Sequence, residues 1–344
     1  MPMKTVKWKE IYKDLKEEIE NGRYRRGDRF LRIKDICEKF EVSDITARRV
    51  LYELERENFI VQKQKVGAII KSLKEEIYVF SPYGWNVKKL LGLEYIRSEI
   101  LKGIIEESIK ENLEVKFISE RYLERNFNKN IFLILYHTFI PTIEKKLISV
   151  KNPNILFLHT SSKFDNVHTI RHDLYKGSYI VIEYLINKGY KKIGFISGFL
   201  NNEWFLPRFE GYISAIRGNK IKFDMKYIKE TNGEKEVEDI KAFEELMDLP
   251  EPPDAIFCAN DRRAIHILEY CNKNNIKVPE EIAICGFDNI PEAELTIPPL
   301  TTVNTKFKEI GEEGVKLAIR LYEERIEEIQ DIVIEPELIE RQTT

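Results

Sequence analysis

The sequence predicts two unlike parts: a small, mainly helical domain that ends in a two-stranded wing, and an α/β domain of two lobes with mainly parallel sheets. Residues 1–71 show helical periodicity followed by two short alternating runs, whereas strand-like and helix-like runs alternate from Ile77 onward. Charge divides in the same way. Residues 1–75 carry 19 Lys and Arg against 14 Asp and Glu, while the whole chain has a net charge of -3. A small basic module is therefore expected on a larger acidic body.

The first 71 residues have the element order of a winged helix-turn-helix domain. Apolar residues recur on one face of the first predicted helix, which makes it amphipathic. Ser43 is a suitable N-cap for the third helix, because its hydroxyl can accept a hydrogen bond from an unpaired backbone N–H. The expected elements are helices over 7–20, 33–40 and 45–58 and wing strands over 60–62 and 68–70.

After a short charged linker at 72–76, residues 77–344 alternate apolar runs of strand length with amphipathic runs of helix length. This rhythm is typical of βαβ units, in which right-handed crossovers join parallel strands. The segment is too long for one ordinary open sheet, so two lobes are expected. Strands are expected at 77–80, 115–118, 131–136, 155–158, 192–196, 255–258 and 283–287, and helices at 95–112, 177–188, 204–217, 237–246, 262–274 and 310–324.

Two predicted strands end in small and acidic residues. The strand at 255–258 leads to Asn260 and Asp261, and the strand at 283–287 leads to Asp288. Parallel strands open onto a ligand crevice at their carboxyl ends, so both carboxylates are expected at one rim of one sheet. Fixed acceptors there suit the hydroxyls of a polyol or sugar. Asp261 is expected mainly as the cap of the helix that follows, and Asp288 mainly as a ligand contact.

Composition indicates a cytoplasmic protein. The chain has 344 residues and 43% hydrophobic content, enough for several cores, and no apolar run approaches the length of a membrane span. Residues 1–21 are charged throughout, unlike a signal peptide. The four cysteines lie far apart, which indicates reduced buried thiols, and no cluster has the spacing of a metal site. No cofactor is expected, because phosphate-binding glycine loops are missing from the sequence.

The third predicted helix carries the candidate DNA-reading side chains. In a helix-turn-helix the start of this helix enters the major groove, where Thr46, Arg48 and Arg49 can reach base edges or phosphates. A basic helix face can also be simple solvated surface, but the ordered motif with its basic excess favours double-stranded DNA as partner. The candidate contacts to the DNA backbone are Lys34, Lys63 and Lys65.

This segment contains Ile19-x-x-Gly22, Gly27-Asp28-Arg29, Val42-Ser43, Thr46, Arg48-Arg49, Leu51-x-x-Leu54 and the wing residue Gly67. With these motifs residues 7–71 resemble the winged helix-turn-helix of the GntR family. The resemblance implies operator contacts from the recognition helix and from the wing at Gly67. Asp44 stands where the family has a basic residue. A carboxylate there repels phosphate, although it could accept a hydrogen bond from a cytosine amino group.

The α/β domain contains Asp173-x3-Gly177, Arg208 to Tyr212, Pro253 to Ile256 with Ala259-Asn260-Asp261, Gly286-Phe287-Asp288-Asn289 and Pro298 to Val303. These motifs resemble the effector domain of LacI-type repressors, which has a periplasmic-binding-protein-like fold. The resemblance implies an effector between the lobes, with lobe crossings near 160–163, 290–303 and 325–331. A GntR-type reader on a LacI-type sensor is the arrangement of the arabinose repressors of Gram-positive bacteria. L-arabinose or a related sugar is therefore the first candidate effector.

The same resemblance implies which side chains hold the effector. Asp288 and Arg208 match the principal hydroxyl-binding pair, and a carboxylate with a guanidinium offers an acceptor and a donor fork for adjacent hydroxyls. Simpler roles remain open, because Arg208 can pair with any acidic neighbour and Asp173 precedes a helix that it can cap. The other expected contacts are Asp173, Asn260 and His159, with Tyr83, Trp85 or Phe205 as an aromatic platform for the sugar ring.

Together these features predict a sugar-responsive transcriptional regulator, most simply a repressor of carbohydrate-utilisation genes. A homodimer would bind a palindromic operator, and the effector would change operator affinity by altering the angle between the lobes. The alternative is a cytoplasmic α/β enzyme that acts on a sugar or nucleoside, with strand-end aspartates as general bases. A transport-type binding protein is disfavoured by the DNA reader.

Overall fold

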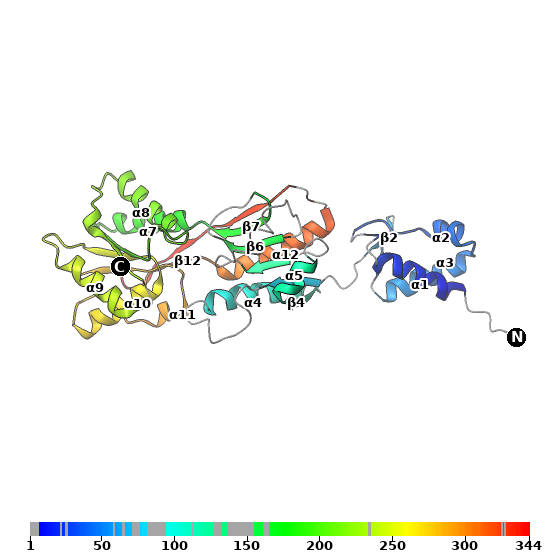
Figure 1. Ribbon diagram of the computed structural model, residues 1–344, viewed down its shortest axis with the longest axis horizontal. Coiled ribbons are helices and arrows are strands. Elements are labelled where there is room, and N and C mark those ends of the chain that lie inside the picture. Colours follow the sequence, from blue (N-terminus) through cyan, green and yellow to red (C-terminus); the bar gives the residue numbers. More distant parts are fainter. Residues whose placement is uncertain are drawn as a thin grey trace.

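A computed structural model of the chain describes residues 7–20, 23–24, 27–57, 59–63, 66–70, 76–80, 94–111, 113–126, 132–135, 155–160, 165–232, 235–324, 326 and 328–344. Figure 1 shows the N-terminal domain, in blue, at one end of an elongated molecule, followed by two α/β lobes. The first strand of the α/β part begins at Glu76, so most of the expected linker at 72–76 lies outside the described residues.

The N-terminal domain is a winged helix-turn-helix, which confirms the predicted fold. Ser43 caps the third helix, because its side chain accepts a hydrogen bond from the Thr46 N–H. The helices and the wing enclose one apolar core that includes the fully buried Leu15, Ile36 and Leu54. The elements are α1 (Lys7–Glu20), α2 (Ile33–Phe40), α3 (Asp44–Arg56) and an antiparallel hairpin of β1 (Ile60–Lys63) and β2 (Gly67–Ile70).

The α/β unit nearer the N-terminal domain, called lobe 1, contains a six-stranded parallel sheet in the order β13-β7-β6-β5-β3-β4. Helices α4 and α12 pack against each other and bury Ile100, Ile104 and Ile310 against the sheet. The strands are β3 (Glu76–Phe80), β4 (Glu114–Ile118), β5 (Phe132–Leu135), β6 (Ile155–Thr160), β7 (His168–His172) and β13 (Asp331–Ile334); the helices are α4 (Glu94–Lys110), α5 (Glu120–Asn126) and α12 (Phe307–Glu324).

The second α/β unit, lobe 2, contains a four-stranded parallel sheet in the order β11-β10-β8-β9. Two apolar clusters cover the two faces of this sheet. The strands are β8 (Ile193–Ser197), β9 (Ile228–Glu230), β10 (Ala255–Cys258) and β11 (Ala283–Cys285), beside an antiparallel pair of β12 (Thr302–Asn304) and β14 (Glu337–Ile339). The helices are α7 (Leu174–Asn187), α8 (Leu206–Gly218), α9 (Glu236–Met247), α10 (Asp261–Lys273) and α11 (Pro291–Leu295), with a 3-10 turn at Met225–Tyr227.

The chain crosses between the lobes later than the sequence suggests. The expected ranges are 160–163, 290–303 and 325–331, but β7 still belongs to the sheet of lobe 1, so the first crossing falls between β7 and α7. The other two fall between β12 and α12 and between β13 and β14. The sequence of β7 explains the first error, because four of its five side chains are polar or charged and the strand does not read as an apolar run. Its Arg171 pairs with Asp331 on β13 at 3.0 Å, and the two strands lie side by side.

Candidate functional site

A buried ion pair between Arg208 and Asp288 forms the centre of the candidate effector site. Asp288 lies beyond the carboxyl end of β11, and Arg208 lies in the first turn of α8. The guanidinium donates through Nη2 to Asp288 Oδ1 at 3.0 Å and through Nη1 to the Ala259 carbonyl, which follows β10. Its charge lies 4.1 Å from the ring centroid of Phe287. The predicted pair is thus in direct contact at the carboxyl ends of two adjacent strands.

Both members of this pair are removed from solvent, with 6% of Arg208 and 9% of Asp288 exposed. Burial raises the pKa of the Asp288 carboxyl to about 6, although the Arg208 charge acts to lower it. Burial likewise lowers the pKa of Arg208, and the charge of Asp288 opposes that shift. Desolvating two charges is costly, and hydroxyls that bond to both groups can offset part of that cost.

Aromatic and histidine side chains of lobe 1 form the other side of the site. His159 lies within β6 and His172 ends β7, and the Nδ1 atom of His159 lies 2.9 Å from the Nε2 atom of His172. The His159 ring stacks on the Trp204 indole of lobe 2, with centroids 4.5 Å apart and planes at 27°. Phe307 presents its ring edge-on to both histidines at 5.5 and 5.1 Å. This cluster therefore joins the two lobes.

His172 is neutral at physiological pH, because burial lowers its pKa to about 3. A backbone hydrogen bond with Thr305 acts in the opposite direction, and the positive charge of Arg208 lowers the pKa further. Trp204 stacks on His159 and lies four residues before Arg208, so the histidine pair and the ion pair are neighbours at the candidate site. A neutral imidazole can both donate and accept, which suits hydroxyl ligands.

The backbone at this site adopts conformations that non-glycine residues rarely take. His159 has φ of 61°, Asp288 has φ of 110° and Asn289 has φ of 52°. The register of β6 against β7 also shifts between Leu158 and Thr160, on either side of His159. Left-handed backbone of this kind costs free energy and gathers at ligand sites, where it aims side chains. The clustering supports a binding role for this region.

The cap role expected for Asp261 belongs to Asn260 in the structure. Asn260 is the N-cap of α10, and its Oδ1 accepts from the Arg263 N–H at 3.1 Å. Asp261 is fully buried as the first helical residue and accepts from the Ile290 N–H at 2.9 Å and from the Thr302 hydroxyl. The cap assignment for Asp261 is therefore wrong by one residue, because α10 begins at 261 and not at 262.

Two other predicted contacts, Asp173 and Phe205, lie among the described residues. Asp173 caps α7 by accepting from the Lys176 N–H at 2.8 Å, the simpler of its two expected roles. Phe205 lies between two cations, with its ring centroid 5.9 Å from Arg208 and 5.1 Å from Arg263. Tyr83 and Trp85 lie outside the described residues. The residues that sequence reasoning missed are His172, Trp204 and Phe307, whose only signal is their position beside predicted strand or helix ends.

The buried carboxyl of Asp261 leads to a prediction about pH. Burial raises its pKa to about 7, and the charge of Asp288 adds to the effect. Because an unfolded aspartate titrates near about 3.9, the folded state holds this proton more tightly, and the resulting stability is lost as pH rises through about 7. Asp261→Asn mimics the protonated form. We expect it to gain stability relative to wild type between pH 5 and pH 8 by at least about 1 kcal/mol, measured by urea unfolding. An identical difference at both pH values would contradict the assignment.

The DNA-reading candidates divide into two groups. Arg48 Nε donates to Asp44 Oδ2 at 2.8 Å, and both side chains are exposed on the first turns of α3. Arg49 instead pairs with the buried Glu53 at 2.6 Å, and its guanidinium carbon lies 5.3 Å from the ring centroids of Trp8 and Tyr52. Arg49 therefore helps to hold α1 against α3, and Arg48 is the stronger candidate for base contact.

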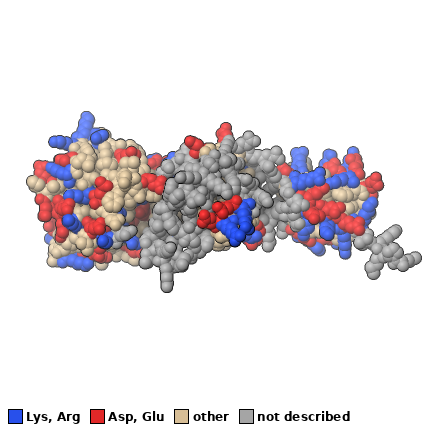
Figure 2. Space-filling model, viewed as in Figure 1, with Lys and Arg blue, Asp and Glu red and all other residues tan. Residues whose placement is uncertain are grey.

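The remaining candidates lie at the edges of this surface. The Thr46 hydroxyl lies 3.1 Å from that of Ser43, within the cap of α3. Lys34 forms an exposed ion pair with Glu38 at 3.6 Å, and Gly67 turns the wing with φ of 93°. Lys63 is exposed at the end of β1, and Lys65 lies outside the described residues. Figure 2 shows that the visible face of this domain mixes basic and acidic side chains. Binding to DNA would therefore depend more on where each basic side chain points than on the net charge of the domain.

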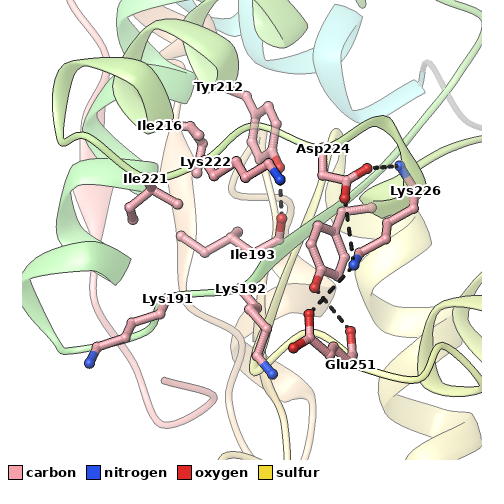
Figure 3. Close-up of a pocket in the computed structure, with 11 residues that line it drawn as sticks. Lys191, Lys192, Ile193, Tyr212, Ile216, Ile221, Lys222, Asp224, Lys226 and Glu251 are labelled. Carbon is pink, nitrogen blue, oxygen red and sulfur yellow. Dashed lines mark hydrogen bonds and ion pairs between the residues drawn. The ribbon is translucent and has the colours of Figure 1, made fainter.

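A separate pocket of about 220 Å³ opens on lobe 2 at the amino ends of β8 and β9, and Figure 3 shows its lining. Its wall includes the apolar Ile193 and Ile216, and Lys226 lies between Asp224 and Glu251 at 3.5 and 3.6 Å. None of the predicted effector residues lines it. Because the ion pair lies at the carboxyl ends of the strands, this pocket is at the opposite edge of the sheet.

In the described part of the chain, no helix is long and apolar enough to span a membrane. Among the same residues, no group of three or more His, Cys, Asp or Glu side chains could hold a metal ion.

Family models match both parts of the chain. Residues 7–70 match the bacterial regulatory proteins of the gntR family, and residues 182–344 match the periplasmic binding protein-like domain. The HTH-type transcriptional repressor CytR of Escherichia coli K12 is 28% identical over 310 residues, which covers 83% of this chain and 88% of the relative. The repressor PurR of Vibrio atlanticus is 33% identical over 168 residues, covering 49% and 50%.

Solved structures share the fold at low sequence identity. A regulatory protein of the LacI family from Chloroflexus aggregans has a TM-score of 0.68 at 23% identity, covering 79% of this chain and 99% of that one. A CelR–cellobiose complex has a TM-score of 0.63 at 19% identity, covering 88% and 92%. A LacI family regulator from Enterococcus faecium with bound ribose has a TM-score of 0.62 at 22% identity, covering 78% and 98%.

Proposed function

Because the chain joins a gntR-family DNA-binding domain to a periplasmic binding protein-like domain, we propose that it is a transcriptional repressor controlled by a small-molecule effector. CytR, which matches over most of the chain, is a transcriptional repressor, and this favours regulation over the alternative of an enzyme acting on a sugar or nucleoside. Effector binding between the lobes would change the angle between them and thereby the affinity for the operator. Effector and operator would each weaken the binding of the other, as thermodynamic linkage requires.

The effector that fits the site best is a sugar or another polyol. The carrying observation is the Arg208–Asp288 pair, which offers a donor fork and a carboxylate acceptor within 3.0 Å of each other in a buried setting. His159 and Trp204 add a polar ring and a flat apolar surface beside it. Structures of the same fold contain cellobiose and ribose, which supports a sugar. L-arabinose or a related pentose is the first candidate to test.

A ligand screen followed by operator binding tests this proposal. Full-length protein is melted with pentoses, hexoses and nucleosides, and a ligand at 100 times its Kd should stabilise the native state by about 2.7 kcal/mol. The stabilising ligand should then weaken binding to an operator selected from random duplex DNA. Selective DNA binding without any effect of the stabilising ligand would refute the induction mechanism, and turnover of a ligand would favour the enzyme.

We infer that the active form is a homodimer, whose two DNA-binding domains bind the two halves of a palindromic operator. Large apolar side chains are exposed on helices of both lobes. Ile109 on α4 is 72% exposed, and Leu295 and Ile297 at the end of α11 are 77% and 79% exposed. The two helices lie along the same lower edge in Figure 1, and the Tyr95 hydroxyl at the start of α4 lies 3.5 Å from the Asn289 carbonyl before α11. A second copy would cover this side.

Charge placed on this side should therefore dissociate the dimer. Leu295→Asp is expected to raise the dimer dissociation constant by at least about tenfold, because a buried apolar contact is worth about 1.5–3 kcal/mol. Sedimentation velocity over a range of concentrations measures the change. Val237→Asp is the matched control, since Val237 is 74% exposed on α9. Equal dissociation by both variants, or by neither, would place the interface elsewhere.

A further inference from the structure

The first turns of α3 expose an unusual set of side chains for a DNA-reading helix. Ile45 is 80% exposed, the highest value among the large apolar side chains of the described residues. Asp44 and Arg48 stand beside it, joined by the 2.8 Å ion pair. An exposed isoleucine gains nothing from electrostatic attraction to phosphate, and a carboxylate is repelled by phosphate. Each of these side chains therefore needs a specific contact on the DNA or on the protein.

The Asp44–Arg48 pair fixes how the guanidinium can be used. The carboxylate takes the Nε–H of Arg48, which leaves the Nη1 and Nη2 groups as a donor fork at the end of the side chain. Two donors in one plane match the N7 and O6 acceptors of guanine in the major groove. Holding a long side chain in this orientation also lowers the entropy lost on binding. Arg49 is not equivalent, because Glu53 occupies its Nη2.

Ile45 precedes Arg48 by three residues and therefore lies on the same face of α3. The one apolar group that bases present in the major groove is the C5 methyl of thymine. We propose that Asp44, Ile45 and Arg48 form a base-reading unit, in which Arg48, positioned by Asp44, binds a guanine and Ile45 packs against the methyl group of a neighbouring thymine. This inference rests on the proposed DNA-binding function and names what the domain reads.

The test uses base analogues in the sequence that full-length protein selects from random duplex DNA. Replacing the contacted thymine with deoxyuridine removes only the methyl group and should weaken wild-type binding about threefold to tenfold, within the range of one apolar base contact. The same replacement should have no effect on Ile45→Ala. Replacing the contacted guanine with 7-deazaguanine should weaken binding of wild type but not of Arg48→Ala.

Asp44→Ala removes both the charge and the acceptor that holds Arg48. Removing a negative charge should strengthen binding to unrelated DNA, whereas loss of the Arg48 partner should reduce the preference for guanine at least about fivefold. Val237→Ala serves as a control for removal of an exposed apolar side chain, and thermal melting confirms that each variant is folded.

If no sequence is enriched by wild type, the proposed DNA-binding function itself fails. If a sequence is enriched but deoxyuridine acts equally on wild type and Ile45→Ala, the base-reading unit is wrong. Loss of a preference for cytosine in Asp44→Ala, with guanine preference intact, would also refute it, because Asp44 would then contact a base itself.

Discussion

Replacement of Asp288 with alanine is expected to abolish the effector response while the variant still binds its operator. The carboxylate is the acceptor of the buried pair with Arg208, and a sugar hydroxyl bound there would lose its fixed acceptor. Removing one member of a buried, hydrogen-bonded charge pair costs about 2–5 kcal/mol of binding, so effector affinity should fall at least about 30-fold. Isothermal titration with the effector and operator release in its presence measure both effects.

The alanine variant also leaves Arg208 buried without its carboxylate, which can cost about 3–5 kcal/mol of stability. Asp288→Asn is the second variant, because its amide oxygen can still accept from Arg208 and preserves the fold. This variant should bind the effector more weakly, because the negative charge is lost, and its melting temperature should stay close to that of wild type. Asp224→Ala is the matched control, since Asp224 lines the separate pocket of lobe 2. A normal effector response in both Asp288 variants would move the effector site elsewhere.

Part of this site can be predicted from sequence, and part cannot. Asp288 follows an apolar strand, and the rule that parallel sheets bind ligands at their carboxyl ends is enough to place it. His172 lies on β7, the neighbour of the strand that carries His159, and β7 does not read as a strand in the sequence. Trp204 reaches His159 from the other lobe, so its approach depends on how the lobes close. The cap role given to Asp261 is wrong by one residue, because periodicity does not resolve the exact start of a helix.

The fold shows the same division between local and distant information. Helices with a clear apolar face, such as α1 and α10, lie within a residue or two of their predicted bounds, because their own side chains determine the period. The strands β7 and β13 escape prediction. β7 has a single apolar residue among five, and β13 is a short run that joins the sheet only by pairing with β7, beside the Arg171–Asp331 ion pair. The points at which the chain crosses between the lobes depend on these strands, so the predicted crossings fall earlier in the chain than the observed ones.

The contact between α4 and α12 gives the second large effect. A Cβ on Gly103 would lie 2.1 Å from the Lys308 carbonyl oxygen, and a Cβ on Gly311 would lie 2.1 Å from the Ile100 carbonyl oxygen. The two backbones thus touch through reciprocal glycines, on helices far apart in sequence. Gly311→Ala must push the helices apart, and such overpacking should destabilise the chain by about 2–3 kcal/mol even though alanine favours helix by about 1 kcal/mol.

Gly218 provides a matched control, because it ends α8 and a Cβ there would meet only the Tyr179 hydroxyl at 3.7 Å. Gly218→Ala should be neutral or slightly stabilising, since helix propensity acts without a clash. Urea unfolding of both variants measures the difference, and Gly311→Ala should also lower the melting temperature by about 4–12 °C. Gly311 and α4 belong to lobe 1, whereas the ion pair belongs to lobe 2. Effector affinity should therefore fall only to the extent that effector binding requires the two lobes to close on each other. Equal stability of the two variants would mean that the helices can separate freely, and the close glycine contact would not then hold lobe 1 together.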